Sequence, residues 1–395
     1  MPNDNLSQAK RAKYDEFYTQ YSDIEKEMTA YLEFNPDVFR GKTILLPCDD
    51  PEWSNFTKYF AQNFDRFGLK KLISTSYAFE SKTYKSNYQP TLFEKNDPQY
   101  DEIKTSSNGK IFTLTSDRTG DQRVNVDDLE WHYLQGDGDF RSEEVKRLRD
   151  ESDIIITNPP FSMFREFLAW ILEAGKQFVI IGSKNAITYK EIFPLIKANK
   201  MWVGSTSFNK DMLFLANEEI DPSERPSTAT RTVDGVVYLR SPSIWFANLD
   251  HGRRHQHLPL MTMEDNLKYS KHKQIKGKTS YDRYDNYDAI EVPYTDAIPS
   301  DCEGVMGVPI SFLDKYNPEQ FLILGSDAYD GSPPTKNYST KEKVVDGKRM
   351  KSNTGTMGCV IREETFGSGT YFDVGYPVKA VYKRIFIRHR RETDK

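Results

Sequence analysis

The sequence lacks the patterns that mark secreted, membrane-spanning and metal-binding proteins. Its 395 residues include only three cysteines, which are odd in number and far apart, so a disulfide framework is disfavoured and a reducing compartment is expected. No CxxC pattern is present, and the histidine-rich stretch 251–257 lacks carboxylate partners beyond Asp250, so we expect no metal site. The first residues contain no apolar signal-peptide region, and no apolar run approaches transmembrane length. We therefore expect a cytoplasmic protein without a membrane partner.

Glycine-rich nucleotide-binding motifs are missing as well. A GxGxxG sequence is absent, which disfavours a dinucleotide pyrophosphate site. The stretch 39–43 is similar to the end of a P-loop, but Pro36 stands where the first glycine of that motif would be. The formal net charge of −5 excludes a global polycation, so any basic surface must be local.

A strand–helix–strand unit is predicted near the N-terminus. Residues 44–47 form a short apolar run, Ser54 is suited to cap the following helix, and Gly68 is suited to end it. A second apolar run covers 71–77 and completes a βαβ unit. This arrangement predicts an α/β fold.

An acidic sequence, CDDP at 48–51, stands at the end of the first of these strands. Ligands of open α/β sheets bind at the carboxyl ends of strands, and carboxylates there commonly hold a ribose or an amino group of a cofactor. The structural alternative is that Asp50 caps the next helix while Pro51 forms the turn. The two roles are compatible.

The most informative stretch is 153–167, which reads DIIITNPPFSMFREF. Its β-branched run 154–156 predicts a strand buried on both faces, and the two following prolines must end that strand. Ser162 is a candidate N-cap for a helix whose apolar residues recur at helical spacing from 163 to 172. A further buried strand is predicted at 178–181.

The Asn-Pro-Pro-Phe sequence at 158–161 carries the chemistry expected at this strand end. The Asn158 side-chain oxygen and the Pro159 carbonyl can accept hydrogens from an exocyclic amino group, while Phe161 can stack on a flat ring. Pro160 helps to hold these groups rigidly. A proline-rich turn that merely leads into a helix is the structural alternative.

A second acidic turn, GDGD at 136–139, precedes a predicted helix. It lacks the spacing and the closing glutamate of an EF-hand, which argues against calcium binding. The functional interpretation places Asp139 at the tip of the next strand, beside the strand that leads into the Asn-Pro-Pro-Phe sequence. The alternative is a simple turn before the helix.

The charge pattern changes near residue 250, where we predict a domain boundary. Between 251 and 283 the sequence has eight Lys or Arg against three acids, with Tyr269 and Tyr281 interleaved. Such local charge is typical of nucleic-acid binding, although a solvated basic face is the alternative. The residues predicted to contact nucleic acid are Arg253, Arg254, Lys268, Lys271, Lys273, Lys276 and Lys278.

Four segments, taken together, resemble the EcoRI-type family of adenine-N6 DNA methyltransferases. They are FYTQYSDIEKE (17–27), CDDPEWSNFTKYFAQNF (48–64), GDGDFRSEE (136–144) and TNPPFSMFREF (157–167), in the order of that family. The resemblance implies a Rossmann-like, seven-stranded sheet of an S-adenosylmethionine-dependent methyltransferase, followed by a C-terminal target-recognition region. The predicted domains are a catalytic domain, 1–250, and a DNA target-recognition region, 251–395.

The resemblance also assigns roles to individual residues. It implies that the FYTQ segment borders the methionine part of the cofactor, that the CDDP turn replaces the usual glycine-rich loop, and that Asp139 lies near the cofactor's adenine ring. The acid expected at the end of the second strand is absent, because Ser76 and Tyr77 stand there. The implied catalytic residues are Asn158, Pro159, Pro160 and Phe161. The implied cofactor-binding residues are Phe17, Tyr18, Thr19, Gln20, Cys48, Asp49, Asp50, Asp139, Phe140 and Asn158.

The function expected from these observations is transfer of a methyl group from S-adenosylmethionine to N6 of a flipped adenine in double-stranded DNA. The expected setting is a restriction-modification system or an orphan or phage modification system, in the cytosol of a bacterium or of a phage-infected host. A cognate restriction endonuclease that acts separately is compatible with it. The alternatives are an RNA-base or protein-glutamine N-methyltransferase, or a catalytically silent DNA-binding module. A second aromatic side chain is expected to stack on the other face of the base. The sequence leaves four candidates for it: Trp202, Phe208, Trp245 and Phe246.

Overall fold

The structure is a computed structural model that describes residues 18–47, 49, 54–78, 97–215, 230–327, 333–338, 342–351, 358–364 and 369–394. The chain divides into two compact units, which are treated separately. The first unit contains the residues up to 184 together with 202–252, and the second contains 185–201 together with 253–395. The assignment of a catalytic domain to 1–250 and of a DNA target-recognition region to 251–395 stays a prediction.

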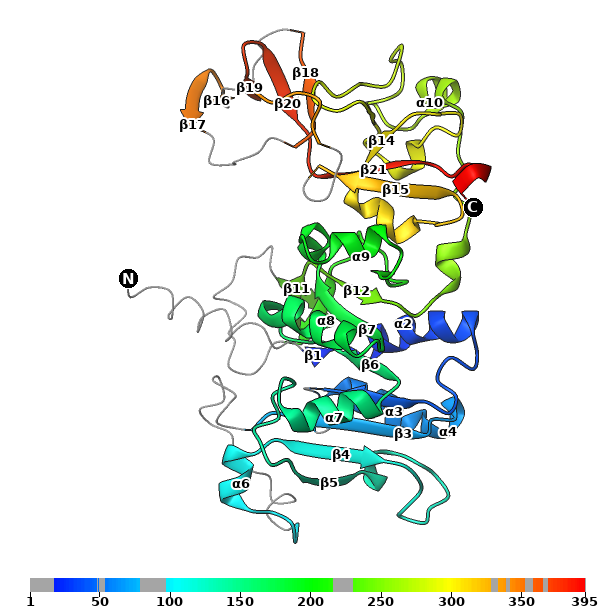
Figure 1. Cartoon of the computed structure of the whole chain (residues 1–395), viewed down its shortest axis with the longest axis vertical. Helices are drawn as coiled ribbons and strands as arrows, with labels where there is room; N and C mark the ends of the chain where they lie inside the picture. Colours follow the sequence, from blue (N-terminus) through cyan, green and yellow to red (C-terminus); the bar gives the residue numbers. More distant parts are fainter. Residues whose placement is uncertain are drawn as a thin grey trace. The chain divides into compact units, whose positions relative to one another are not determined.

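A mixed sheet of eight strands forms the centre of the first unit (Figure 1). In spatial order its strands are β5 (Glu130–Tyr133), β4 (Lys110–Leu114), β3 (Lys71–Ser76), β2 (Thr43–Leu46), β6 (Ile154–Thr157), β7 (Gln177–Ser183), β12 (Ser243–Ala247) and β8 (Trp202–Val203). The four central strands, β3, β2, β6 and β7, are parallel, and the outer strands pair antiparallel. The α/β class is therefore confirmed, with eight strands in the described residues where the resemblance implied seven.

The helices of the first unit connect these strands. They are α2 (Tyr21–Phe34), α3 (Asn55–Gln62), α4 (Phe64–Phe67), α6 (Glu102–Ser107), α7 (Glu143–Glu151) and α8 (Phe164–Glu173). The Ser54 hydroxyl accepts the amide hydrogen of Phe56, and Gly68 ends α4 with a φ of 62°, as the sequence predicted. The single helix predicted between them is divided at Asn63 into α3 and α4. The predicted cap at Ser162 is wrong. Residues Phe161–Met163 form a 3-10 turn, and α8 begins at Phe164.

The central strands are buried on both faces, which explains their continuous apolar sequence. All four residues of β2 and all four of β6 are buried. Aromatic side chains of α3 and α4 pack over them, with the Phe60 ring centroid 5.6 Å from that of Phe39. Each such buried side chain contributes about 1.5–3 kcal/mol relative to its exposed state, so this cluster holds the sheet in place.

A second, antiparallel sheet of the first unit joins the N-terminal segment to strands that lie about two hundred positions later. Its order is β1 (Tyr18–Thr19), β9 (Met212–Leu215), β11 (Val236–Ser241) and β10 (Thr230–Val233). Strands β10 and β11 form a hairpin, in which Asp234 and Gly235 have φ values of 50° and 79°. These left-handed values suit a two-residue turn of type I′.

The second unit is built mainly from two small sheets. One has the order β13 (Ile290–Glu291), β14 (Met306–Pro309), β21 (Arg384–His389) and β15 (Phe321–Ser326). The other has the order β17 (Lys348–Lys351), β16 (Glu342–Val345), β19 (Thr370–Asp373), β20 (Pro377–Ala380) and β18 (Val360–Arg362). Two short helices, α9 (Phe193–Lys197) and α10 (Met263–Tyr269), accompany them.

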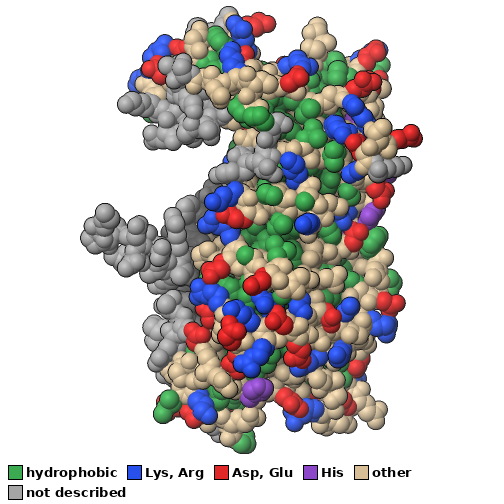
Figure 2. Space-filling model, viewed as in Figure 1, with side chains coloured by type: hydrophobic (Ala, Val, Ile, Leu, Met, Phe, Trp, Pro, Cys, Tyr) green, Lys and Arg blue, Asp and Glu red, His purple; other side chains and the backbone are tan. Residues whose placement is uncertain are grey.

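The described part of the chain contains no helix with the length and apolarity that a membrane span requires. Within the same residues no cluster of three or more His, Cys, Asp or Glu side chains is arranged to hold a metal ion. On the side of the first unit seen in Figure 2, acidic and basic side chains are interspersed over α7 and its surroundings. The described residues on that side therefore form no patch of only acidic or only basic side chains.

Candidate active site and nucleic-acid interface

The sheet order reverses direction at β2, which creates a candidate crevice at the carboxyl ends of its strands. Strand β2 pairs in parallel with β3 on one side and with β6 on the other. The chain runs from β2 to β3 first and reaches β6 only after the antiparallel β4 and β5. Ligands of open α/β sheets bind at such a point, outside the carboxyl ends of the strands. The CDDP turn follows β2 and the Asn-Pro-Pro-Phe sequence follows β6, so the fold brings the two predicted segments together.

Asp49 connects the two strand ends directly. Its carboxylate is buried, with 7% of the residue exposed. The Thr157 hydroxyl lies 2.6 Å from Asp49 Oδ2 and 2.8 Å from the Pro47 carbonyl oxygen, and these two acceptors share its one hydrogen. The Ser54 hydroxyl donates to Asp49 Oδ1 at 2.8 Å. One carboxylate thus joins the end of β2, the end of β6 and the start of α3.

The FYTQ segment is attached to the same place. The Asn55 side-chain amide, at the start of α3, donates a hydrogen bond of 2.8 Å to the Thr19 carbonyl. Within the described ranges, Thr19 Oγ1 and Gln20 Nε2 are buried polar atoms without a hydrogen-bond partner. Leaving such a buried group unpaired costs about 1–3 kcal/mol, so these two atoms point to a polar ligand beside β1. The donor set fits a molecule with carboxylate, amino or hydroxyl groups.

The Asn-Pro-Pro-Phe sequence lies where the prediction put it, directly after β6. Asn158 and Phe161 are half-buried, and Phe161 also packs against the core. Two of the four candidates for a second stacking aromatic are core residues, because Trp245 is 1% exposed and Phe246 is fully buried. Phe208 is also buried, with 9% exposed, so Trp202 is the half-buried candidate.

The GDGD turn reaches the carboxyl end of β3. The Ala78 amide donates to the Asp137 carbonyl at 2.7 Å, and a Cβ added to Gly138 would lie 2.4 Å from the Ser76 carbonyl oxygen. The sequence lacked an acid at the end of this strand, and the fold brings the backbone of the GDGD turn there from a segment about sixty positions later. The Asp137 carboxylate itself accepts the Asp139 amide hydrogen at 3.1 Å. The contact between Asp137 and Ala78 was not predicted, because nothing local in the sequence relates the two residues.

Asp139 is held by Arg141. The guanidinium donates to Asp139 Oδ1 through Nε at 2.9 Å and to Oδ2 through Nη2 at 2.5 Å. These hydrogen bonds lower the pKa of the Asp139 carboxyl. Phe140, beside it, is fully buried, and its ring centroid lies 5.1 Å from that of Phe167. Asp139 is therefore a charged acceptor at the sheet edge, whereas Phe140 belongs to the core.

Some of the predicted cofactor-binding residues are not among the described residues. Phe17, Cys48 and Asp50 lie outside the described residues, and so does the side chain of Tyr18. Their predicted cofactor contacts stay predictions.

The predicted nucleic-acid contacts of the second unit differ in exposure. Arg254 is 6% exposed and donates to the Asn199 side chain at 2.6 Å, and Arg253 pairs with Asp314 at 3.3 Å. Five lysines of the set are exposed at the surface: Lys268, Lys271, Lys273, Lys276 and Lys278. Among these, Lys271 pairs with Asp296 and Lys278 with Asp282, whereas Lys268, Lys273 and Lys276 have no acidic partner in the described part of the chain. The exposed lysines are better placed than the two arginines to reach a polyanion.

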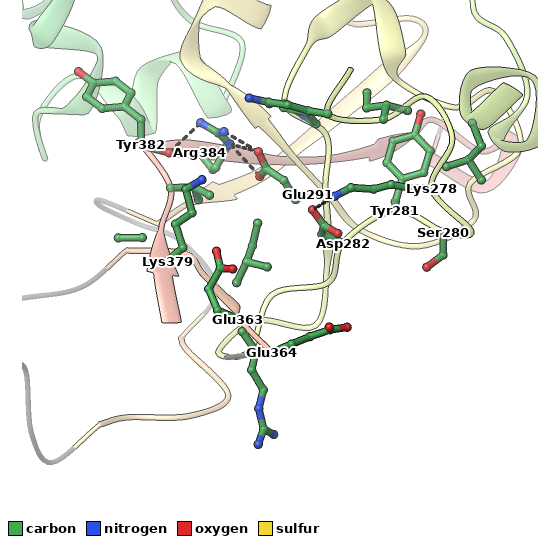
Figure 3. A pocket seen from close by; sticks show the side chains of 18 residues that line it. Lys278, Ser280, Tyr281, Asp282, Glu291, Glu363, Glu364, Lys379, Tyr382 and Arg384 are labelled. Carbon is green, nitrogen blue, oxygen red and sulfur yellow. Dashed lines mark hydrogen bonds and ion pairs between the residues drawn. The ribbon is translucent and has the colours of Figure 1, made fainter. Parts of the chain in front are cut away.

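A cavity of about 580 Å³ in the second unit includes Lys278 in its wall (Figure 3). The Lys278 ammonium pairs there with Asp282. Deeper in the wall, Arg384 and Glu291 form an ion pair that Figure 3 shows as dashed lines. Glu363, Glu364 and Lys379 also line the cavity, so its charge is mixed. The charges in its wall therefore favour neither an anionic nor a cationic ligand.

Comparison with known proteins identifies the family. The family described as "Adenine-specific methyltransferase EcoRI" matches residues 5–390. The chain belongs to this family. The resemblance seen in four short segments is thereby confirmed over nearly the whole chain. As a member of the EcoRI methyltransferase family, the chain is a site-specific, adenine-specific DNA methyltransferase.

Three curated relatives of this EcoRI-family methyltransferase are similar over most of their length. The Type II methyltransferase M.EcoRI of Escherichia coli is 42% identical over 321 residues, which cover 81% of this chain and 88% of the relative. The Type II methyltransferase M.MpnI of Mycoplasma pneumoniae is 33% identical over 81% of this chain and 84% of its own. The Type II methyltransferase M.MgeORF184P of Mycoplasma genitalium is 33% identical over 89% of this chain and 93% of the relative. No solved structure matches the chain.

Proposed function

We propose that the enzyme transfers a methyl group from S-adenosylmethionine to N6 of an adenine flipped out of double-stranded DNA. The observation that carries this proposal is the network Thr157–Asp49–Ser54, which joins the strand end before Asn158 to the CDDP turn. Asn55 extends it to the FYTQ segment. Hydrogen bonds therefore link the predicted catalytic segment to the predicted cofactor segments near the carboxyl ends of β2 and β6, which supports transfer between two bound molecules.

S-adenosylmethionine supplies a methyl group that a sulfonium centre activates. We assign its binding to the crevice between β2, β3 and β6. The buried polar atoms of Thr19 and Gln20 would hold its amino-acid end. The carboxylates of the GDGD turn would take the place of the acid that β3 lacks, and Asp139, kept ionised by Arg141, suits an amino or hydroxyl group. Asp49, whose two oxygens already accept hydrogen bonds from Ser54 and Thr157, would act by positioning.

The Asn-Pro-Pro-Phe sequence would hold the target base. The N6 lone pair of adenine is delocalised into the ring, so the amino group is a poor nucleophile. Hydrogen bonds from N6 to the Asn158 oxygen and the Pro159 carbonyl favour a more tetrahedral nitrogen, and that nitrogen attacks the methyl group in line. Flipping costs a few kcal/mol. Stacking on Phe161 offsets about 1–3 kcal/mol of that cost.

The second unit would read the DNA sequence. Its exposed lysines at 268–278 would neutralise phosphates and set the register, while base contacts in a groove would specify the site. The setting we propose is the cytosol of a bacterium or of a phage-infected host, within a restriction-modification or a stand-alone modification system. A separate restriction endonuclease is the partner in the first case.

The test is methyl transfer from radiolabelled S-adenosylmethionine to unmethylated double-stranded DNA, followed by nucleoside analysis and sequencing of modified sites. N6-methyladenine at one short motif is expected. Label in RNA or protein but not in DNA, together with cofactor binding, would overturn the proposed substrate. Loss of cofactor binding as well would leave a DNA-binding module.

The Asn158→Ala variant separates catalysis from binding. Methyl transfer should fall by at least 10²-fold, because the N6 hydrogen bond is lost at the moment of attack. Cofactor affinity, measured by isothermal titration calorimetry, should stay within about threefold, or less than roughly 1 kcal/mol. The exposed Ser162→Ala is the matched control next to the tetrapeptide and should keep activity. Full turnover in Asn158→Ala would exclude this role for Asn158.

A further inference from the structure

One face of the small sheet β1-β9-β11-β10 forms the wall of an open cavity of about 790 Å³. In the pairing register Arg231 lies opposite Tyr238, and Leu213 lies opposite Arg240, so these side chains share one face. The opposite face carries the buried Phe214 and Leu239 and packs on the core. Helix α2 contributes Lys26 to the same cavity, and the loop before β9 contributes Lys210.

A buried glutamate fixes the geometry of this cavity. Glu27 of α2 is fully buried, and its carboxylate accepts hydrogen bonds from the backbone amide and the hydroxyl of both Ser205 and Thr206, at 2.8–3.0 Å. A Cβ added to Gly204 would lie 2.1 Å from Glu27 Oε1, so the loop approaches α2 closely. Ser205 and Thr206 are therefore held against α2 at the opening.

The cavity has a surplus of positive charge. Four of its lining residues are cations and two, Asp23 and Asp211, are acids. Asp211 is already paired with Arg240 at 2.8 Å and with Lys184 at 3.1 Å. Three cations remain: Lys26, Lys210 and Arg231 are exposed, and no ion pair of theirs occurs within the described ranges.

The cavity adjoins the candidate active site along the chain, at Gln20. Gln20 lines it, and Gln20 follows Thr19, whose carbonyl is bound by Asn55 beside the Asp49 network. A surface with three exposed cations, a tyrosine and side-chain amides suits a chain of phosphodiesters. S-adenosylmethionine carries a single carboxylate and would need one such cation.

We propose that Lys26, Lys210 and Arg231 form a DNA-phosphate subsite that holds the target strand beside the flipped adenine. The inference rests on the proposed function and adds contacts with the DNA backbone to the base contacts proposed for the first unit. Each phosphate contact should release counterions, so the slope of log affinity against log salt should change by about 0.9 per contact. Arg240 is kept in position by Asp211 and orients the wall of the subsite.

The test compares the single variants Lys26→Ala, Lys210→Ala and Arg231→Ala, and the triple variant, with the unaltered enzyme. Fluorescence anisotropy measures the Kd of each variant for a DNA duplex that contains the motif at which the enzyme transfers methyl groups. The measurement is repeated at several salt concentrations. In the triple variant the slope of log affinity against log salt should become smaller in magnitude by about 2–3. The triple variant should also bind DNA at least 10²-fold more weakly. Its Kd for S-adenosylmethionine should stay within about twofold, a difference of less than roughly 0.5 kcal/mol.

Lys70→Ala is the matched control, because Lys70 is an exposed lysine of the same unit that directly precedes β3, at the amino end of the strands. It should leave the salt slope unchanged. An unchanged slope in the triple variant would overturn the subsite, and so would a loss of cofactor affinity, which would assign the cations to the cofactor. Failure of the unaltered enzyme to methylate DNA would instead refute the proposed function, so the two failures are distinguishable.

Discussion

The Thr157 hydroxyl donates a hydrogen bond of 2.6 Å to the carboxylate of Asp49, and Thr157 is the residue immediately before Asn158. A buried carboxylate from the turn after β2 therefore helps to fix the strand end that precedes the proposed catalytic amide. Both residues are buried, with 7% of Asp49 and none of Thr157 exposed. The contact ties the geometry of the Asn-Pro-Pro-Phe sequence to that of the CDDP turn.

Removing the Thr157 hydroxyl should destabilise the first unit and misplace Asn158. Thr157→Val leaves a buried carboxylate with one donor fewer, which costs about 1–3 kcal/mol in unfolding free energy. Urea unfolding of Thr157→Val, Asp49→Asn and the double variant should give a coupling energy of about 0.5–3 kcal/mol. Thr113→Val, in the half-exposed part of β4, is the control and should show no coupling to Asp49. If the changes in unfolding free energy caused by Asp49→Asn and Thr157→Val were additive, the direct contact would be contradicted.

The close approach of the GDGD turn to β3 predicts a strong effect of one added methyl group. Gly138 has a φ of +87°, and a Cβ there would lie 2.4 Å from the Ser76 carbonyl oxygen. Gly138→Ala should weaken S-adenosylmethionine binding at least tenfold, because the turn must move away from the strand end. Calorimetric titration measures this loss.

Gly136→Ala provides the comparison within the same turn. Nothing lies within 4 Å of a Cβ added at Gly136, so this variant should bind the cofactor with nearly unaltered affinity. Equal affinities in the two variants would show that the turn does not form part of the cofactor site.

The buried ion pair of the second unit predicts a large loss of stability when one partner is removed. Arg384 is 8% exposed and donates to Glu291 through Nε at 2.9 Å and through Nη2 at 2.5 Å. Arg384→Met leaves the Glu291 charge uncompensated and should cost about 3–5 kcal/mol, measured by thermal and urea unfolding. The additional change Glu291→Gln should restore part of that loss.

Arg349→Met is the control for a surface pair. Arg349 has 62% of its side chain exposed and bridges Glu342 and Asp373 in the second sheet of this unit. Its loss should change the unfolding free energy far less than Arg384→Met, because water screens exposed pairs. A comparable loss in both variants would mean that burial does not determine the strength of the Arg384 pair.

Acid should destabilise the first unit through Asp128. Backbone hydrogen bonds from Thr119, Arg118 and Asn125, at 2.8–3.0 Å, lower the pKa of its carboxyl from 3.8 to about 2. Because the folded-state pKa lies below the unfolded one, the contribution of Asp128 is complete above about pH 4 and is lost as the pH falls toward 2. Asp128→Asn should be less stable at neutral pH and should lose less stability between pH 4 and pH 2.

The measurement is the urea midpoint of unfolding as a function of pH. Asp127→Asn is the matched control, since Asp127 is its exposed neighbour, and this variant should keep the acid-dependent loss that Asp128 contributes. Parallel pH curves for Asp128→Asn and the unaltered enzyme would contradict the assignment.

The sequence by itself determined the elements that depend on neighbours along the chain. The β-branched run before Asn158 had to be a buried strand, and two prolines had to end it, because the proline ring removes backbone donors and fixes φ. Ser54 and Gly68 could be assigned as helix ends for the same kind of local reason. The four family segments were also readable, because each is continuous. Ser162 was the local error, since a 3-10 turn from Phe161 postponed the helix start to Phe164.

Only the tertiary structure decided which distant groups meet. Asp49 and Thr157 are 108 positions apart, Glu27 and Thr206 are 179 apart, and no periodicity relates either pair. The pairing of β2 with both β3 and β6 determines the first contact, and the packing of α2 against a later loop determines the second. Arg254, basic in sequence, is buried by the same long-range packing. Local sequence restricts φ, ψ and burial, whereas the partner of a polar group depends on how strands and helices pack in three dimensions.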